Sequence, residues 1–280
     1  MAIKSFEGKT AFITGGASGI GLGIAKAFSA RGARIVIADL RPDHIEKALA
    51  TFAGGAQSNS VSAIEIDVTN REAYADAAEK MQAEFGGIDI LVNNAGVGVE
   101  GPILEARYAD WDFGLGVNVN GVVNGLQAFL PQMIAHGRGG HIVNTSSLAA
   151  AVMMPEQFVI YAAGKAAVLN MSENMREVLA AKNIGMSVLL PAFTKSNIHE
   201  AARNRPAHLR KDSGFKASEK ALSEREIGAE WMEPEEVGEM VAKGVLNNDL
   251  YIITHGQFKN RMRERAEAML AATPESDFQF

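Results

Sequence analysis

The chain of 280 residues contains no cysteine, and this absence excludes two kinds of site. Without thiols the protein has neither disulfides nor the thiolate ligands of zinc and iron–sulfur centres. The sequence also lacks any apolar run of about 20 residues, the length that spans a bilayer. Its first segment, Met1 to Lys9, has no apolar stretch of the kind found in signal peptides. The sequence therefore predicts a cytoplasmic protein with no membrane partner.

Blocks of like charge are absent as well. The formal net charge is −6, and no basic stripe indicates a nucleic-acid partner. The six histidines show no metal-ligand spacing, so no metal site is predicted. The composition, with 47% hydrophobic and 21% charged residues, is typical of a globular protein with a large core. No Pro- or Ser-rich linker divides the chain, so residues 1–280 are predicted to form one domain.

Short apolar runs alternate with segments of helical length along the chain. Seven runs have the character of buried parallel strands. They are Thr10–Thr14, Arg34–Asp39, Ala63–Asp67, Ile88–Asn93, Gly140–Thr145, Gly185–Leu190 and Leu250–Thr254. Helical spacing is found in Ile20–Arg31, Asp43–Phe52, Arg71–Phe85, Tyr108–His136, Phe158–Lys182, Pro234–Asn247 and Gly256–Ala272. The alternation predicts an α/β fold: a doubly wound, mostly parallel seven-stranded sheet with helices on both faces, of the Rossmann type.

One long segment, Ser196–Trp231, breaks this alternation. It is polar and charged, and segments of this length without secondary structure are usually functional or mobile in compact domains. Because it follows the sixth strand, we predict a mobile lid over a substrate site at about residues 196–231. Four basic residues near its middle are expected on a solvated face: Arg203, Arg205, Arg210 and Lys211.

A glycine-rich stretch, Thr14-Gly15-Gly16-Ala17-Ser18-Gly19-Ile20-Gly21, joins the first strand to the first helix. Glycines let the chain turn sharply there and let a phosphate group approach the backbone. The helix N-terminus adds N–H donors and a partial positive charge. Such turns also serve structure alone, so the motif by itself is a weak signal. The residues predicted to contact a pyrophosphate are Gly15, Ser18, Gly19, Ile20 and Gly21.

Acidic and amide residues end the following strands at the same sheet edge. Asp39 lies 18 residues after the last glycine of the turn, where a carboxylate can accept hydrogen bonds from an adenosine ribose and repels a 2′-phosphate. NAD is therefore favoured over NADP, although Arg41 could partly offset the repulsion. Asp67 and Val68 could hold the adenine, and Asn94 closes the fourth strand beside the same cofactor.

Tyr161 has a lysine, Lys165, four residues later, which puts both side chains on one face of a helix. Alone, this pair is an ordinary helix-surface contact. Ser147, at the end of the fifth strand, adds a third polar group, with Ser146 as its rival for that role. The pKa of a phenol, about 10, must fall to about 7 for it to act as a base near neutrality, and an ammonium about 4.5 Å away supplies most of that change. The set can therefore accept an alcohol proton while the carbon loses a hydride.

Taken in order, these motifs resemble those of the short-chain dehydrogenase/reductase family. The matching stretches are Thr14 to Gly21, Asn93-Asn94-Ala95-Gly96, Asn118 with Gly121, Ser147, and Tyr161 with Lys165. The resemblance covers about Gly8 to about Ile198 and implies an NAD(P)-linked oxidoreductase acting on a secondary alcohol or ketone.

The resemblance also implies roles for single residues. Tyr161 would be the acid or base, and Lys165 its activator and a ribose ligand. Ser147 would orient the substrate, and Asn118 would hold a water in a proton relay. The sequence departs from the family pattern after the sixth strand, where Pro191-Ala192 replaces the usual Pro-Gly. Ser196 stands where the family has a threonine that binds the carboxamide of the cofactor, and it keeps the hydroxyl.

The C-terminal part resembles bacterial NAD-dependent dehydrogenases that oxidise the benzylic secondary alcohol of lignin-derived β-aryl ethers. The residues concerned are Asn197-Ile198-His199-Glu200, Asn204-Arg205-Pro206, Trp231-Met232-Glu233-Pro234 and Tyr251 to Gly256. This resemblance implies a bulky apolar or aryl substrate. The candidates for apolar pocket walls, which could equally be core residues, are Val152, Met153, Met154, Phe158 and Phe193.

Three alternatives stay open. The first two are other enzymes of the same family, namely a reductase of 3-oxoacyl thioesters and a steroid or sugar alcohol dehydrogenase. The third, a non-catalytic dinucleotide sensor, is less favoured because all four catalytic residue types are present. The helical segments Tyr108–His136 and Phe158–Lys182 are apolar on more than one face, so a homodimer or homotetramer is also predicted.

Overall fold

The protein is described by a computed structural model that covers residues 3–53, 60–224 and 228–275. Within these residues, seven strands form one sheet in the order β3-β2-β1-β4-β5-β6-β7, and every neighbouring pair is parallel. The strands are β1 (Thr10–Thr14), β2 (Arg34–Asp39), β3 (Val61–Glu65), β4 (Ile90–Asn93), β5 (Gly140–Thr145), β6 (Ile184–Leu190) and β7 (Tyr251–Ile253). The direction of winding reverses between β1 and β4, as in doubly wound folds. The predicted α/β class is confirmed.

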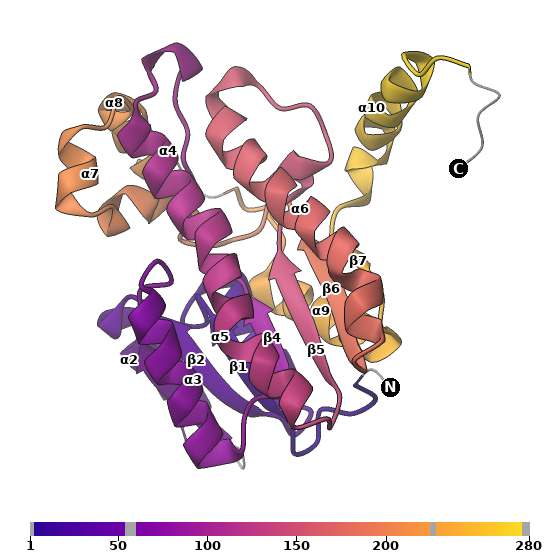
Figure 1. The fold of residues 1–280 in the computed structure, drawn as a ribbon. Helices are drawn as coiled ribbons and strands as arrows, with labels where there is room; N and C mark the ends of the chain where they lie inside the picture. The colour runs from indigo at the N-terminus through magenta and orange to yellow at the C-terminus, as the bar shows by residue number, and fades with distance from the viewer. Residues whose placement is uncertain (1–2, 54–59, 225–227, 276–280) are drawn as a thin grey trace.

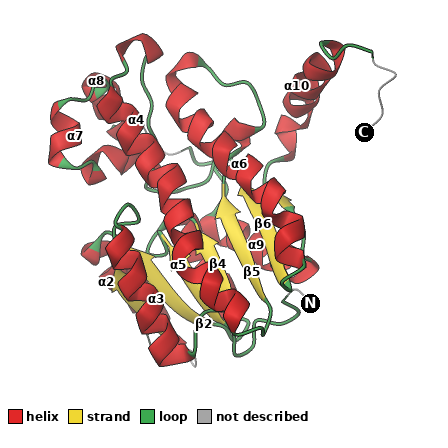
Figure 2. Cartoon of the chain, viewed as in Figure 1, coloured by secondary structure: helices red, strands yellow, loops and turns green. Residues whose placement is uncertain are grey.

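Helices cover both faces of the sheet (Figures 1 and 2). The core of one face includes residues of α1 (Gly19–Ser29), α2 (Pro42–Phe52) and α9 (Pro234–Asn247). The core of the other face includes residues of α3 (Arg71–Phe85), α5 (Gly121–Ala135) and α6 (Val159–Ala180). Successive side chains of a strand serve opposite faces, so Ile13 of β1 belongs to the first core while Phe12 packs on Phe129 of α5.

Each predicted strand is present, with bounds within two residues of the prediction. The predicted helix Tyr108–His136 is divided, because α4 (Tyr108–Leu115) and α5 are joined by η3 (Gly116–Asn120), a turn of π-helix. Such turns often occur at functional sites. At the C-terminal end, a 3-10 turn, η7 (Gly256–Phe258), leads into α10 (Lys259–Ala271), which projects from the body of the molecule (Figure 1).

The segment after β6 is a helical insert rather than a polar loop. It contains η6 (Ile198–Asn204), α7 (Ala207–Lys211) and α8 (Lys216–Ser223). Its apolar side chains Ala201 and Phe215 are buried in a small core with residues from the segment after β4, from α4 and from α6. The expectation of a solvated basic face is wrong for Arg205, which is 1% exposed. Its burial follows from partners on α4 and α8 that are far away in the sequence.

Two expected absences concern the described residues only. No helix among them is both long and apolar enough to cross a membrane. Within 3–53, 60–224 and 228–275, no group of three or more His, Cys, Asp or Glu side chains could hold a metal ion.

A buried histidine lies in the sheet, on β5. His141 has no exposed surface, and its Nε2 lies 2.8 Å from Oγ of Ser187 on β6. Because that hydroxyl already donates to the carbonyl of Asp249, the histidine must donate to it through Nε2–H. The other nitrogen, Nδ1, has no partner in the described part of the chain. Burial, together with Arg176, lowers the pKa of His141 to about 3, so the ring stays neutral.

His141 should therefore make the fold sensitive to acid. In the unfolded chain its pKa is near 6.5, so between pH 6.5 and 3 the unfolded state binds a proton that the folded state does not. Its contribution is fully present above pH 6.5 and declines as the pH falls, by about 2 kcal/mol between pH 7 and 5. His141→Gln should lose about that much less stability over this range than the wild type in urea unfolding, and His208→Gln, at an exposed position, should behave as wild type. Equal pH slopes in all three proteins would contradict the assignment.

Candidate active site

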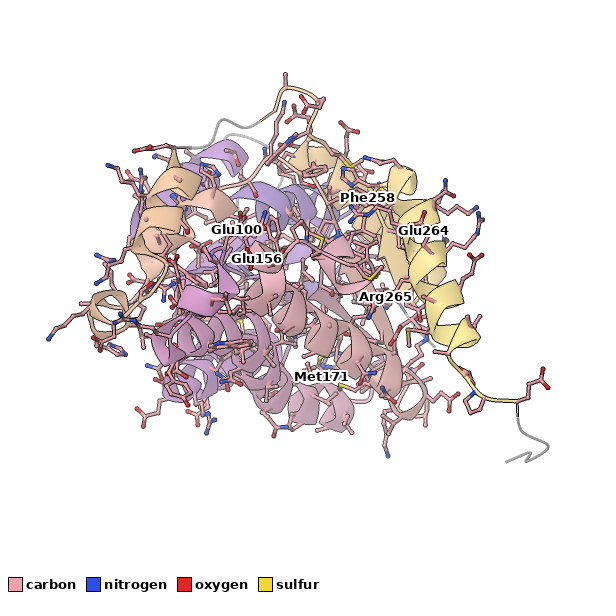
Figure 3. All side chains as sticks on the ribbon, turned by 90° about the horizontal axis from the view of Figure 1, so that it is seen from above. Glu100, Glu156, Met171, Phe258, Glu264 and Arg265 are labelled. Carbon is pink, nitrogen blue, oxygen red and sulfur yellow. The ribbon has the colours of Figure 1, made fainter. Side chains whose placement is uncertain are left out.

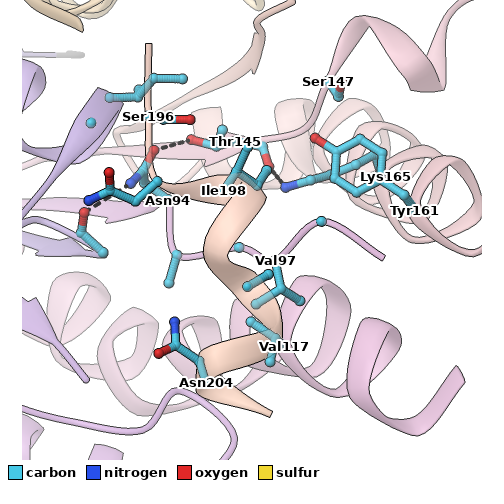
Figure 4. A pocket seen from close by; sticks show the side chains of 18 of the residues that line it. Asn94, Val97, Val117, Thr145, Ser147, Tyr161, Lys165, Ser196, Ile198 and Asn204 are labelled. Atoms are coloured by element: carbon cyan, nitrogen blue, oxygen red, sulfur yellow. Dashed lines mark hydrogen bonds between the residues drawn. The ribbon is translucent and has the colours of Figure 1, made fainter. Parts of the chain in front are cut away.

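A cavity of about 560 Å³ opens at the carboxyl ends of the strands (Figure 4). It collects residues from the ends of six strands, from α6 and from the insert. Of the predicted site residues, those that line it are Gly15, Ser18, Gly19, Ile20, Asp39, Asp67, Val68, Asn94, Ser147, Tyr161, Lys165 and Ser196. Gly21 and Asn118 lie behind this surface. The structure thus brings together side chains that are up to 181 positions apart in the sequence, Gly15 and Ser196.

The glycine turn has the geometry that an anion requires. Gly15 and Gly19 have φ values of 61° and 47°, which only glycine adopts without strain. A Cβ on Gly19 would lie 2.9 Å from Cβ of Ser196, so the insert passes directly over the turn. A Cβ on Gly21 would lie 2.1 Å from the carbonyl oxygen of Gly15, which explains why glycine is needed behind the cavity wall. Ser18, the N-cap of α1, makes no side-chain capping bond, so the first N–H groups of this helix are left for a ligand.

Asp39 lies at the end of β2 with only 8% of its surface exposed. One carboxylate oxygen accepts the N–H of Ala17 at 3.1 Å, and the other accepts the N–H of Arg41 at 3.1 Å. These bonds fix the carboxylate beside the glycine turn. The guanidinium of Arg41 points instead to Asp43, which binds it through both oxygens at 2.8 Å. This pairing raises the pKa of Arg41, and Glu200 of the insert and Asp39 add to the effect.

Two threonines that the sequence reasoning missed hold the strand ends together. The Oγ1 of Thr14, at the end of β1, accepts the N–H groups of Asn94 and Ala95 at 2.9 and 3.0 Å. The side chain of Asn94 donates to the carbonyl of Thr14 and accepts from the hydroxyl of Thr145, at the end of β5 (Figure 4). These bonds tie β1, β4 and β5 at the floor of the cavity. One sign of this role was present in the sequence, since a threonine is the last residue of both β1 and β5.

Lys165 and Tyr161 lie one turn apart on α6, at one side of the cavity (Figure 4). Lys165 is 3% exposed, and its ammonium donates to the carbonyl of Thr145 at 2.9 Å. The ammonium lies 5.7 Å from the centroid of the Tyr161 ring. Burial lowers the pKa of Lys165 to about 8, because no carboxylate compensates the charge.

The pKa of Tyr161 moves in the direction opposite to the one expected. Burial raises it, and its hydrogen bond with Ser147 lowers it less than burial raises it. The carboxylate of Glu100, which also lines the cavity, raises it further. In the ligand-free protein Tyr161 is therefore a protonated phenol at neutral pH. This is the form that donates a proton.

The two neighbouring serines have different surroundings. The hydroxyl of Ser146 donates to the backbone carbonyl of Lys165 at 2.6 Å and is thereby turned to the helix. The hydroxyl of Ser147 is hydrogen-bonded with Tyr161. It also accepts the N–H of Ala149 at 3.1 Å, at the start of a 3-10 turn. The structure thus brings Ser147, and not Ser146, to the phenol.

Asn118 lies in the π-helical turn η3 and is 1% exposed. Its side chain donates to the carbonyl of Val97 at 2.9 Å and accepts the N–H of the same residue at 3.0 Å. A Cβ on Gly96 would lie 3.0 Å from Oδ1 of Asn118 and 3.3 Å from Nζ of Lys165. Asn118 therefore lies behind Lys165 and fixes the segment that follows β4.

Aromatic and sulfur-bearing side chains form part of the lining of the cavity. Of the predicted wall residues, Val152, Met154, Phe158 and Phe193 line it, whereas Met153 does not and is 68% exposed. The ring of Phe193 lies 5.6 Å from that of Trp231 and 6.0 Å from that of Phe258. Phe258 and Arg261, at the root of α10, had not been predicted (Figure 3). Helical spacing alone gives no sign that this segment returns to the cavity.

Comparisons with known proteins agree with this geometry. Residues 9–207 match the family described as short chain dehydrogenase. A C alpha-dehydrogenase of Sphingobium sp. strain SYK-6 is 43% identical over 282 residues, which cover 98% of this chain and 90% of that protein. The similarity therefore includes the insert and most of the C-terminal part.

Solved structures give the same result. A short chain dehydrogenase/reductase from Burkholderia phymatum in complex with NAD superposes with a TM-score of 0.88 and 31% identity, covering 99% of this chain and 100% of that one. The apo form of LigD from Sphingobium sp. strain SYK-6 superposes with a TM-score of 0.79 and 36% identity, covering 97% of this chain and 100% of that one.

Proposed function

The chain belongs to the short-chain dehydrogenase family, and from this premise we propose that it transfers a hydride between NAD and a bulky secondary alcohol or ketone, with benzylic alcohols as the substrate class. Family membership makes the protein an oxidoreductase that uses NAD(P). One observation carries the finer proposal: Ser147, Tyr161 and Lys165 converge on a cavity that is also lined by three neighbouring aromatic rings. Such a lining suits an aryl group.

In the proposed reaction Tyr161 exchanges a proton with the substrate oxygen. The phenol gives its proton to a ketone, and the phenolate takes the hydroxyl proton of an alcohol. Ser147 hydrogen-bonds the same oxygen and orients it, while the charge of Lys165 favours the phenolate. Bound NAD supplies the acceptor for the hydride that leaves the alcohol carbon. Asn118 keeps the segment after β4 in place, and its family role would be to hold a water of the proton relay.

The residues that would hold the cofactor fit a dinucleotide. The open N–H groups of the turn from Gly15 to Gly21 suit the pyrophosphate, and Asp39 suits the ribose hydroxyls. Asp67 and Val68 suit the adenine, and Asn94, Lys165 and Ser196 suit the nicotinamide half. We assign the insert the role of a substrate lid on a single domain, since four residues of η6 line the cavity: Ile198, His199, Ala201 and Asn204.

The proposed preference for NAD over NADP rests on the carboxylate of Asp39 and on the pairing of the Arg41 guanidinium with Asp43. A 2′-phosphate at this place would meet the carboxylate of Asp39. Arg41 could compensate only by leaving Asp43, which holds it through two hydrogen bonds. Asp43 thus keeps the nearest guanidinium from a phosphate.

The test of the function is a screen of NAD-linked oxidation over benzylic, steroid, sugar and 3-hydroxyacyl secondary alcohols. Benzylic alcohols should give the highest kcat/KM. Tyr161→Phe and Ser147→Ala should each lower turnover by at least about a hundredfold, whereas Ser146→Ala should stay within a few-fold of wild type. A higher kcat/KM for acyl or steroid alcohols would replace the substrate class, and an active Tyr161→Phe variant would refute the proton transfer.

Lys165 should set the pH at which alcohol oxidation becomes fast. Oxidation needs the phenolate, so its rate rises with pH toward the pKa of Tyr161 in the complex. A unit charge about 6 Å away is worth about 3 kcal/mol at an effective dielectric of about 20, so Lys165→Met should move this rise upward by about two pH units. The difference from wild type should be largest below pH 8, where Lys165 is charged. Lys182→Met, at an exposed position, should leave the profile unchanged; an unshifted profile in Lys165→Met would contradict the role.

Cofactor choice should respond to both acidic residues. Asp39→Ala should narrow the ratio of kcat/KM for NAD over NADP by at least about tenfold, or about 1.4 kcal/mol. Asp43→Ala should narrow it by about threefold, because an exposed ion pair is worth less than 1 kcal/mol. Glu46→Ala, on the same helix, removes the same charge without freeing Arg41 and should leave the ratio unchanged. A wild-type preference for NADP would show that the reading of this site is wrong.

We also propose that the protein is a homodimer or homotetramer. A shallow depression between α4, η3 and α6 is lined by Trp111, Leu115, Val119, Ala163 and Ala167. Apolar side chains on α5 and α6 are exposed as well, with Val178 at 60%. A partner helix pair would cover this face. Light scattering at micromolar concentration should give a multiple of the 29.8 kDa chain mass, and a monomer mass would refute the assembly.

A further inference from the structure

The insert is fixed to the rest of the molecule by a buried arginine. Arg205 lies between two carboxylates, 3.2 Å from Asp110 on α4 and in an ion pair with Glu219 on α8. It also donates to the carbonyl of Ala109 at 3.0 Å, and its guanidinium lies 4.4 Å from the centroid of the Phe113 ring. The side chains of Arg205 and Asp110 have no exposed surface.

Asp110 is itself held from several directions. Its carboxylate accepts the hydroxyl of Ser213 at 2.6 Å and the N–H of Gly214 at 2.9 Å, both from the insert. It accepts the N–H of Arg107 at 2.9 Å as well, at the start of α4. One carboxylate therefore joins the first turn of α4 to two separate places in the insert. A charge buried in this way keeps its position because every alternative leaves it unpaired.

The residues just before Arg205 form the cover of the cavity, and three residues just after it, Pro206, His208 and Leu209, also line the cavity. In Figure 4 the ribbon of η6 runs from Ile198 to Asn204 across the cavity, and both residues line it. This helix is a 3-10 helix of seven residues, longer than such helices usually run, with correspondingly weak internal hydrogen bonds. Its ion pair between Glu200 and Arg203 is exposed. The cover, residues 196–204, is thus held less by its own hydrogen bonds than by Ala201, which is buried in the small core, and by Arg210, which donates to the carbonyls of Ala202 and Arg203.

We propose that Arg205 is a positioning residue that divides the insert into a fixed base and a movable cover. The base, residues 205–221, stays on α4 whether or not a ligand is present. The cover alone opens and closes, between Arg205 at one end and the backbone bond from Lys195 to Met232 at the other. This refines the predicted lid, since only residues 196–204 move. The identity of the ligand beneath the cover rests on the proposed function.

Hydrogen exchange of the free protein and of its NAD complex tests the division. Amides of residues 205–221 should exchange slowly in both states. Amides of residues 196–204 should exchange fast in the free protein and at least about tenfold more slowly with NAD. Ligand-dependent protection spread over the whole insert would overturn the proposal, as would a cover that is already fully protected without NAD.

Arg205→Met tests the role of the side chain, with Lys211→Met, at an exposed cation of the base, as the matched control. In Arg205→Met the amides of residues 205–221 should exchange at least about tenfold faster than in the wild type. NAD should no longer slow the exchange of the amides of residues 196–204. KM for NAD should rise by about tenfold while kcat stays within about threefold, because Tyr161 on α6 and Ser147 after β5 lie outside the insert. Lys211→Met should match the wild type in all these readouts.

The outcomes separate this proposal from the proposed function. If the base of Arg205→Met exchanges faster but NAD protects the cover as in wild type, Arg205 is structural only and the proposal fails. If Arg205→Met does not fold, Glu219→Gln decides by the same readouts, because it keeps the shape of the buried pair and removes one charge. If the wild type does not bind NAD, the cofactor assignment fails, while the exchange of the free proteins still decides whether Arg205 fixes the base.

Discussion

Parallel pairing in the sheet is the constraint on which the rest of the structure depends. Because every strand runs in the same direction, the chain leaves each strand at the same edge. Thr14, Asp39, Asn93, Thr145 and Leu190 are therefore the last residues of neighbouring strands, although they come from distant parts of the sequence. The hydrogen bonds among their side chains and the residues that follow them build the floor of the cavity. An antiparallel strand in the middle of the sheet would remove its end from this edge.

Local patterns in the sequence were sufficient for this framework. Buried strands show as short apolar runs, and in a parallel sheet the residue after each run lies at the site. Asp39, Asn94 and Ser147 could therefore be placed from the sequence alone, since their surroundings follow from the topology. Tyr161 and Lys165 needed only the helical repeat, because four residues form about one turn. Each of these five residues is placed by the strand or helix that carries or precedes it, together with a general rule of the fold.

The sequence failed where a side chain depends on a distant partner. Arg205 lies in a polar stretch and carries no local sign of burial, which follows from Asp110 almost a hundred positions away. The contribution of Phe258 to the cavity wall depends on its packing against Phe193, which is 65 positions earlier in the sequence. The direction of the pKa change at Tyr161 depends on how far burial outweighs the neighbouring charges. Each of these properties depends on interactions between residues that are far apart in the sequence. The periodicity of the sequence carries no information about such interactions.

Lys165 in the site and Arg205 in the insert, two deeply buried cations, show how such a balance separates the chemical role of a charge from its structural role. Lys165 is compensated by one backbone carbonyl, so burial lowers its pKa toward the physiological range and its charge remains responsive. Arg205 is compensated by two carboxylates and a carbonyl, and a guanidinium does not lose its proton in proteins. A buried charge with only this one hydrogen-bond partner among the described residues suits Lys165, which must favour the loss of the proton from the hydroxyl of Tyr161. Two carboxylate partners around a group that cannot titrate suit an anchor, because its position does not change with pH or with the ligand.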